Sequence, residues 1–361
     1  MKTSPSKTIS FYPGPSKIHE KVNHYFQEGF ECGIFEVNHR SPSFMDLLGK
    51  TKKLLQSKLE IPIEYDIVLT SSATECWEII AQSLTGGTSV HFHNGAFGEK
   101  WFDYTNKITS RAISSPFGLD DKLSMAGLAV HKNTDLICIT HNETSNGTQL
   151  NDEVIRTIRE RHDDIVIAVD ATSSMAGVRL EWEQADIWFA SVQKCFGLPP
   201  GLAVMILSPR AIERARKRGD KRYYNSLNFV LSNYQKNQTP YTPNTIGIYL
   251  LSRYLEQVSY ITEVAGHIHN RYTDISSFLE EKIGLQHVCA NKSCRSQTVL
   301  AYKYDVEELM LLKQRMKKNN IVLGNGYGSW KTNSFRVANF PAITDAEFDK
   351  LKDVFQSIKQ N

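Results

Sequence analysis

Short apolar runs recur between residues 66 and 207, and they constrain the fold more than any other feature of the sequence. Each run has at most seven residues, most are rich in Ile and Val, and all but SVHFH lack the strict alternation of a strand with one solvent-exposed face. This pattern is typical of parallel strands that are buried on both faces. The runs are DIVLT (66–70), SVHFH (89–93), DLICIT (135–140), DIVIAVD (164–170), DIWFAS (186–191) and LAVMIL (202–207).

Segments with helical spacing of apolar residues accompany these runs. They cover residues 44–59, 77–84 and 151–162. Alternation of strands and helices predicts an α/β fold, with a mostly parallel sheet sandwiched by helices. Ligands of such sheets bind outside the carboxyl ends of the strands, so the polar residues that follow each strand are the first candidates for chemistry.

The pattern changes after Pro243. A long helical segment covers 245–283, with an expected break near Gly266, and a last helix begins near Asp345. Strand-like runs lie between them, at 297–302 and 334–338. These elements predict a smaller α+β domain at the carboxyl-terminal end.

A chain of 361 residues has room for two or three domains. Because no Gly/Ser-rich or Pro-rich hinge is present, we expect the boundary to fall inside the long helical segment. The predicted division is a large domain over 12–250 and a small domain over 251–361, with residues 1–11 packed near the small one.

Charge and cysteine content exclude several classes of protein. Lys and Arg number 42 and Asp and Glu 39, so the net charge of +3 gives no support to a dedicated nucleic-acid or membrane-surface binder. The six cysteines form no CxxC pair, which argues against a zinc site and a disulfide framework. No segment resembles a signal peptide or a membrane span. We therefore expect a cytoplasmic protein without a metal.

Residues 210–222 form the most basic segment, with seven Lys or Arg among thirteen residues. Such a helix could attract an anionic ligand or a nucleic acid, but a solvated helix face is the more common reason for this composition. We favour the solvated face.

Two strand ends carry an acid and an amine. Asp170 ends one predicted strand in VDATSS, and Lys194 follows another in ASVQKCFGLPPG. A pyridoxal phosphate enzyme needs a lysine that reacts with the aldehyde and a carboxylate that keeps the pyridine nitrogen protonated. From this pair alone, a helix-capping aspartate and a solvated lysine remain the simpler interpretation.

Other strand ends favour the cofactor. In SSATE (71–75), Ser72 and Thr74 stand at a predicted helix start, where backbone N–H groups attract phosphate. Phe97 could stack on a flat ring, and Thr144 could donate a hydrogen bond to a phenolic oxygen. Taken singly, the three sites also fit a helix cap, a core phenylalanine and a polar turn. Their agreement favours a common ligand.

On these motifs the chain resembles the class V aminotransferases of fold type I, above all the branch of phosphoserine and alanine/serine–glyoxylate aminotransferases. The order and spacing of the motifs make the resemblance specific. They are FYPGP (11–15), NHRSPSF (38–44), SSATE (71–75), NGAFG (94–98), HNETSNG (141–147), VDATSS (169–174), SVQK (191–194), TPNT (242–245) and SFRVANF (334–340).

The resemblance implies pyridoxal 5′-phosphate as cofactor. Lys194 would be the lysine that forms the imine, and Asp170 the partner of the pyridine nitrogen. It further implies cofactor contacts from Ser72, Ala73, Thr74, Phe97, Thr144, Gln193, Asn244 and Thr245. Because such enzymes supply the last two residues from the neighbouring subunit, it also implies a homodimer with shared active sites.

The resemblance also implies a substrate site. Arg336 matches the arginine that grips the α-carboxylate, and a guanidinium suits a carboxylate because the two groups form a two-bond fork. His39 and Arg40 match the loop that binds the distal group. Phosphoserine aminotransferases usually carry a second His-Arg pair where this chain has Ser329 and Trp330.

The expected function is therefore amino transfer from L-glutamate to 3-phosphohydroxypyruvate, with an alanine/serine–glyoxylate reaction as the alternative. For the missing pair, Lys331 is a candidate replacement cation. Cysteine desulfuration on the same scaffold would need a mobile thiol, for which Cys294 is the candidate. A non-catalytic regulator would normally carry a DNA-binding domain, for which we expect no room beside these motifs.

Overall fold

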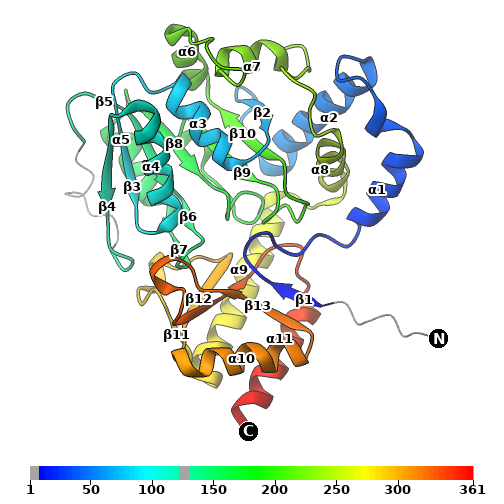
Figure 1. Cartoon of the computed structure of the whole chain (residues 1–361), viewed down its shortest axis with the longest axis vertical. Helices are drawn as coiled ribbons and strands as arrows, with labels where there is room; N and C mark the ends of the chain where they lie inside the picture. Colours follow the sequence, from blue (N-terminus) through cyan, green and yellow to red (C-terminus); the bar gives the residue numbers. More distant parts are fainter. Residues whose placement is uncertain (1–7, 122–129, 361) are drawn as a thin grey trace.

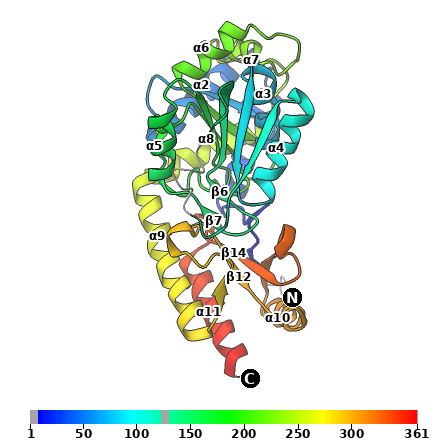
Figure 2. The same cartoon turned by 90° about the vertical axis from the view of Figure 1, so that its left-hand side faces the viewer.

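The structure is a computed structural model that describes residues 8–121 and 130–360. Its described residues form two main sheets, one of seven strands in the upper half of Figure 1 and one of five strands in the lower half. Figure 2 shows helices on both sides of the larger sheet, with α4 (Ala96–Thr109) and α5 (Asp152–Arg161) on opposite sides of the strands. The expected α/β architecture is confirmed.

The larger sheet has the strand order β2-β10-β9-β8-β5-β3-β4. All six predicted apolar runs form strands of this sheet, and their centres are fully buried, as at Ile137, Val169 and Phe189. The bounds are β2 (Asp66–Thr70), β3 (Thr88–His93), β4 (Ala112–Pro116), β5 (Thr134–Thr140), β8 (Val166–Asp170), β9 (Ile187–Ser191) and β10 (Ala203–Leu207).

Two features of this sheet differ from the prediction. The run at 202–207 was expected to be a parallel strand, but β10 pairs antiparallel with both β9 and β2. The connecting segment 192–202 contains no helix and is too short for the crossover that parallel neighbours need. The edge strand β4 was missed, because its sequence AISSP is short, polar and half exposed.

Helix α2 (Pro42–Leu59) shows why a predicted helix forms where it does. The Ser41 side chain accepts a hydrogen bond from the Phe44 backbone N–H at 3.3 Å, and Pro42 occupies the first turn. Phe44, Leu48 and Leu55 then recur at helical spacing with no exposed surface. The predicted helix over 44–59 is confirmed.

Ser41→Ala should lower the free energy of unfolding by about 1 kcal/mol, because one backbone N–H at the start of α2 loses its partner. Urea denaturation of the two proteins measures this difference. Ser43→Ala, an exposed position in the first turn of the same helix, is the control and should change stability by less than about 0.5 kcal/mol. Equal midpoints for Ser41→Ala and Ser43→Ala would contradict the capping role.

The remaining helices around the larger sheet are α1 (Val22–Glu31), α3 (Ala73–Ser83), α6 (Pro209–Arg218), α7 (Leu227–Tyr234) and α8 (Thr245–Gln257). Helix α3 contains most of the segment predicted at 77–84 but begins four residues earlier. Helix α5 confirms the segment predicted at 151–162. Helix α8 packs against α1 and α2, which lie beside it in Figure 1.

Most basic residues of the segment 210–222 are exposed, as expected for a solvated face, and two of its arginines form ion pairs with the larger sheet. Helix α6 ends at Arg218, because Gly219 adopts a left-handed conformation with φ of 64°. Arg214 pairs with Asp135, and Arg210 Nε lies 3.6 Å from Asp186 Oδ1. These pairs fasten the helix to the amino-terminal ends of β5 and β9.

The smaller sheet has the order β1-β13-β14-β12-β11, and β1 pairs parallel with β13. Its strands are β1 (Ile9–Phe11), β11 (Gln286–His287), β12 (Val299–Lys303), β13 (Ile321–Asn325) and β14 (Ser334–Ala338), flanked by helices α9 (Ile261–Ser277), α10 (Val306–Lys318) and α11 (Asp345–Gln360). The strand-like runs at 297–302 and 334–338 and the last helix are confirmed. The division at residue 250 stays a prediction.

The predicted break near Gly266 is wrong. Gly266 lies inside α9 at an exposed position, where a glycine costs only about 1 kcal/mol. The helical segment breaks instead between Gln257 and Ile261. There the Lys58 Nζ of α2 donates to the Val258 carbonyl at 2.7 Å and lies over the Tyr260 ring. A contact between residues 200 positions apart therefore lies at the point where α8 ends.

Within residues 8–121 and 130–360, no helix has the length and apolar character needed to cross a membrane. The same ranges contain no group of three or more His, Cys, Asp or Glu side chains that could hold a metal ion.

Candidate active site

A cavity of about 200 Å³ lies at the carboxyl ends of β5, β8 and β9, where Thr140, Asp170 and Ser191 are the last strand residues. The starts of α3 and α4 complete its walls. Its lining residues are Ala73, Thr74, Trp77, Phe97, Lys100, Tyr104, Thr140, Asn142, Thr144, Asp170, Thr172, Ser191, Gln193 and Lys194. Seven of the predicted site residues therefore meet in one cavity.

Lys194 is only 7% exposed, and its amine is held by two hydroxyl groups. The Nζ atom donates to Thr144 Oγ1 at 2.9 Å and to Ser173 Oγ at 3.0 Å. Burial lowers the pKa of Lys194 to about 8; Asp170 opposes this shift and Arg336 adds to it. A lower pKa increases the share of neutral amine, which is the nucleophilic form.

The loop that carries Lys194 is fixed by backbone hydrogen bonds. Gly197 N–H donates to the Lys194 carbonyl at 2.9 Å, and Val192 N–H donates to the Leu202 carbonyl at 3.1 Å. The preceding chain adds a second anchor, because Ser16 N–H donates to the Gln193 carbonyl at 3.0 Å. These bonds hold the lysine backbone on both sides of the reactive residue.

Asp170 is buried and firmly oriented. Its Oδ2 accepts from Trp77 Nε1 at 3.1 Å, and its Oδ1 accepts from the Thr172 backbone N–H at 2.9 Å. Burial raises the pKa of Asp170, whereas its hydrogen bonds and the charge of Lys194 act in the opposite direction. A desolvated carboxyl of this kind is suited to pair with one protonated nitrogen of a ligand.

The start of α3 brings two of its three predicted residues, Ala73 and Thr74, to the cavity. The Ser72 hydroxyl accepts from the Glu75 backbone N–H at 3.1 Å and so caps the helix, and Ser72 is not among the described residues that line the cavity. Ala73 N–H donates to Ser191 Oγ at 2.9 Å. Thr74 is exposed and does line the cavity. The Ser72 hydroxyl accepts in this cap and keeps its own proton for donation, so its predicted contact with phosphate stays a prediction.

Glu143 holds the start of α4, which carries Phe97. The carboxylate is 1% exposed and accepts from the backbone N–H groups of Phe97 and Gly98, both at 3.1 Å. Burial raises the pKa of Glu143, while the helix N–H groups and Ser145 stabilise its charged form. The Phe97 ring centroid lies 5.2 Å from Lys194 Nζ, so its ring stands beside the amine, as expected for a stacking residue.

Arg336 is 3% exposed on β14. Its Nε donates to the Asn325 carbonyl and its Nη1 to the Thr144 carbonyl, both at 2.7 Å. Nη2 has no hydrogen-bond partner among the described residues. The guanidinium is thereby tied to the turn that holds the Lys194 amine. Arg336 is not among the described residues that line the cavity, and its contact with a substrate carboxylate stays a prediction.

Besides Ser72 and Arg336, four predicted site residues are not among the described residues that line the Lys194 cavity of their own chain. Asn244 caps α8, since its side chain accepts from Gly247 N–H at 2.9 Å and donates to the Gly201 carbonyl at 3.1 Å. Thr245 follows it in the first turn of α8. Arg40 is exposed and donates to Gln238 Oε1 at 2.8 Å; His39 precedes it. Their expected roles across a subunit interface stay predictions.

The residues at the missing His-Arg pair lie in the short helix η5 (Gly328–Trp330). Ser329 and Lys331 are exposed, and neither is among the described residues that line the cavity. The cavity-lining cation beside Lys194 is instead Lys100 of α4.

Cys294 does not fit the desulfurase interpretation. It is 8% exposed in a short helical turn, and its sulfur lies 3.9 Å from Ser293 Oγ. Cys294 is also not among the described residues that line the cavity. A buried thiol away from Lys194 cannot serve as a mobile sulfur acceptor there.

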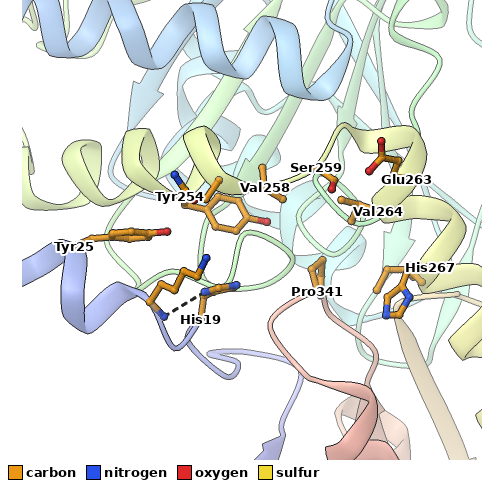
Figure 3. Close-up of a pocket in the computed structure, with 12 residues that line it drawn as sticks. His19, Tyr25, Tyr254, Val258, Ser259, Glu263, Val264, His267 and Pro341 are labelled. Atoms are coloured by element: carbon orange, nitrogen blue, oxygen red, sulfur yellow. Dashed lines mark hydrogen bonds between the residues drawn. The ribbon is translucent and has the colours of Figure 1, made fainter.

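A larger cavity of about 390 Å³ lies between α1, the end of α8 and the start of α9 (Figure 3). Figure 3 shows the ring of His19, whose Nδ1 accepts from Lys21 N–H at 3.3 Å, below the ring of Tyr254. This cavity lacks a buried amine beside a carboxyl, so the smaller cavity is the candidate for chemistry.

The smaller cavity fits pyridoxal 5′-phosphate. It offers a nucleophilic amine, a buried carboxyl and an aromatic ring around one space. Gln193 Oε1 and Asn142 Oδ1 are buried there without a hydrogen-bond partner among the described residues, and such atoms call for a ligand or water. Four supporting residues of the site were not identified from the sequence: Trp77, Glu143, Ser173 and Ser191. Each forms a hydrogen bond with a residue that is distant in sequence.

The chain is similar in sequence and fold to known aminotransferases. A family model described as "Aminotransferase class-V" matches residues 13–331. Phosphoserine aminotransferase of Corynebacterium glutamicum (strain R) is 26% identical, covering 97% of this chain and 95% of its own. The phosphoserine aminotransferase structure from Cytophaga hutchinsonii is 30% identical with a TM-score of 0.91, covering 97% of this chain and 98% of its own. Alanine–glyoxylate aminotransferase from Nostoc sp., at 20% identity and a TM-score of 0.84 over 99% and 97%, shares the fold.

Proposed function

Because the chain belongs to the class V aminotransferases, which use pyridoxal 5′-phosphate, we propose that it transfers the amino group of L-glutamate to 3-phosphohydroxypyruvate. One observation carries the chemistry: the Lys194 amine and the Asp170 carboxyl, from two strand ends, face one cavity whose other walls suit the cofactor. Relatives named phosphoserine aminotransferase, similar over nearly their whole length, support the choice of substrate.

Different residues of the cavity would bind different parts of the cofactor. Asp170 would pair with the pyridine nitrogen, Phe97 would pack on the ring, and Thr144 would contact the ring hydroxyl. The phosphate would lie at the start of α3, near Ala73, Thr74 and Gln193. When bound, the cofactor supplies an aldehyde that condenses with amines and a ring that accepts electrons from the substrate Cα.

Lys194 performs the proton transfer. Its neutral amine would take the proton from the substrate Cα and hold it as an ammonium within reach of the bound cofactor. The two hydroxyls of Thr144 and Ser173 hold Nζ in place, so the amine needs little reorganisation before it acts. Arg336 orients the substrate through its α-carboxylate.

We also infer a homodimer in which the His39–Arg40 loop and the Asn244–Thr245 pair serve the partner's cavity. Support comes from their absence among the described residues that line their own cavity, from the exposed position of Arg40 and from the cap position of Asn244. Dilution to nanomolar concentration should then lower the cofactor affinity and the activity together. Analytical ultracentrifugation follows the dissociation of the dimer, and absorbance follows the loss of cofactor.

Serine or alanine with glyoxylate is the second candidate reaction. It is favoured by the uncharged Ser329 and Trp330, which supply no cation for a phosphate.

The test is the visible absorbance of the purified protein during titration with an amino donor. We expect a band near ~410–430 nm that L-glutamate and O-phospho-L-serine convert to a band near ~330 nm at lower concentration than L-serine or L-alanine do. Conversion at lowest concentration by L-serine or L-alanine would support the glyoxylate reaction instead. If no donor converts the band, the transaminase proposal fails.

A further inference from the structure

Tyr327 lies between two side chains that the proposed function uses. Its ring stacks on Phe97, with centroids 5.1 Å apart and an interplanar angle of 19°. The guanidinium carbon of Arg336 lies 5.5 Å from the centroid of the same ring. Tyr327 is not among the described residues that line the Lys194 cavity, so it contacts Phe97 and Arg336 from outside.

Lys100 fixes the far end of Tyr327. Its Nζ donates to the Tyr327 hydroxyl oxygen at 3.0 Å and lies 5.6 Å from the Tyr327 ring centroid. Lys100 stands three residues after Phe97 on α4, so both side chains project from the same side of one helix. The hydrogen bond to Tyr327 raises the pKa of Lys100, which keeps the amine charged at neutral pH.

The backbone around Tyr327 is also tied to both neighbours. Gly326 N–H donates to the Ser334 carbonyl at 3.2 Å, two residues before Arg336 on β14. A Cβ at Gly328 would lie 3.5 Å from Ala96 Cβ, so the turn touches the start of α4. The turn thus joins the strand that carries Arg336 to the helix that carries Phe97.

We propose that Tyr327, held by Lys100, is a positioning residue that keeps the Phe97 ring and the Arg336 guanidinium at a fixed distance and orientation relative to each other. This inference rests on the proposed function, in which Phe97 packs on the cofactor ring and Arg336 on the substrate carboxylate. The two ligands react only when they meet at a fixed offset, and a misplacement of about 1 Å can cost 10²-fold in rate. Tyr327 contacts both Phe97 and Arg336 and therefore sets the relative position of the cofactor and the substrate.

The rival explanation is that Lys100 itself binds a second anionic group of the substrate, since it lines the cavity. The two explanations differ in one respect. A positioning role affects every amino donor equally, whereas direct binding affects only donors with a second anion.

The experiment uses the loaded full-length protein with Tyr327→Phe, Tyr327→Leu, Lys100→Met, Lys100→Arg and the double variant Tyr327→Phe/Lys100→Met. Two properties are measured: the dissociation constant of pyridoxal 5′-phosphate with its induced circular dichroism, and kcat and KM for L-glutamate and L-alanine. Lys107→Met is the matched control, because Lys107 is an exposed cation over a tyrosine ring on the same helix.

We expect Tyr327→Phe and Lys100→Met each to raise KM about 2- to 10-fold for both donors, the range for one lost hydrogen bond. The double variant should be no worse than either single one, because both remove the same bond. Lys100→Arg should restore most of the loss. Tyr327→Leu should raise KM on the order of 30-fold and weaken the induced circular dichroism, because Phe97 loses its stacking partner. Lys107→Met should stay within about 2-fold.

A Lys100→Met effect confined to L-glutamate, or additive effects in the double variant, would overturn the proposal. Normal cofactor dichroism and KM in Tyr327→Leu would do the same. If the wild-type protein converts no donor, the proposed function fails by itself, and the cofactor affinity and dichroism of the variants still test the role of Tyr327 at Phe97.

Discussion

Replacing Lys194 by alanine lowers the rate of amino transfer by at least on the order of 10⁴-fold, the largest effect we expect from any single change. In the proposed reaction the amine acts both as the nucleophile toward the cofactor aldehyde and as the base at the substrate Cα. No second buried amine lines the cavity among the described residues. Single-turnover absorbance with L-glutamate measures the loss, and the band near ~410–430 nm disappears with the amine.

The loss must come from chemistry and not from unfolding. Urea denaturation should show a folded Lys194→Ala protein, and Lys53→Ala, an exposed lysine on α2, should retain full activity. Full activity in Lys194→Ala would refute the assignment.

The pKa of Lys194 adds a dependence on pH. Because burial lowers this pKa to about 8, the neutral amine that attacks the aldehyde gains population as the pH rises through that value. The rate at which the cofactor-free protein takes up pyridoxal 5′-phosphate should therefore increase between pH 7 and pH 9, as stopped-flow absorbance can follow. A rate that keeps rising about tenfold per pH unit up to pH 10, with no levelling above pH 9, would indicate an unperturbed lysine.

Asp170→Asn should lower the rate about 10²- to 10³-fold, the range found when one preorganised charge contact in an active site is lost. An amide of the same shape keeps the cavity filled but cannot hold a proton on the pyridine nitrogen, so the ring accepts electrons poorly. Steady-state kinetics with saturating cofactor measure the change.

Trp77→Phe provides a graded companion to Asp170→Asn. It removes one of the two donors to Asp170 and leaves the charge in place, so we expect a loss of about 2- to 10-fold. A Trp77→Phe loss as large as that of Asp170→Asn would mean that orientation, and not charge, is the contribution of Asp170.

The sequence predicted the centre of the fold well, because burial on both faces leaves a local signal. The sequence analysis missed strand β4 and helix α4, each for a different reason. Strand β4 is an exposed edge with little apolar content. Helix α4 has no capping side chain at Gly95, and its first N–H groups are satisfied by Glu143, 45 and 46 positions away. A cap supplied from so far along the chain leaves no mark on the local sequence.

The same distinction applies to the site. Lys194, Asp170, Phe97 and Thr144 follow strands, so their convergence could be predicted from the sheet. Trp77 reaches Asp170 across 93 positions, and Lys100 reaches Tyr327 across 227. Ser72 shows the reverse problem, because a hydroxyl at a helix start suits a ligand and a cap equally well, and in the structure it caps the helix.

The antiparallel turn between β9 and β10 has a consequence for how such an enzyme can change its substrate. The lysine stands in a hairpin between two central strands, closed by its own backbone hydrogen bonds, so mutations that lengthen this loop would disrupt the sheet itself. The segment 326–331 lies at the surface between β13 and β14, with Ser329 and Lys331 exposed. New specificities can therefore arise, by natural drift or in a directed library, at the exposed Ser329 and Lys331, while Lys194 and the contacts of Tyr327 stay intact.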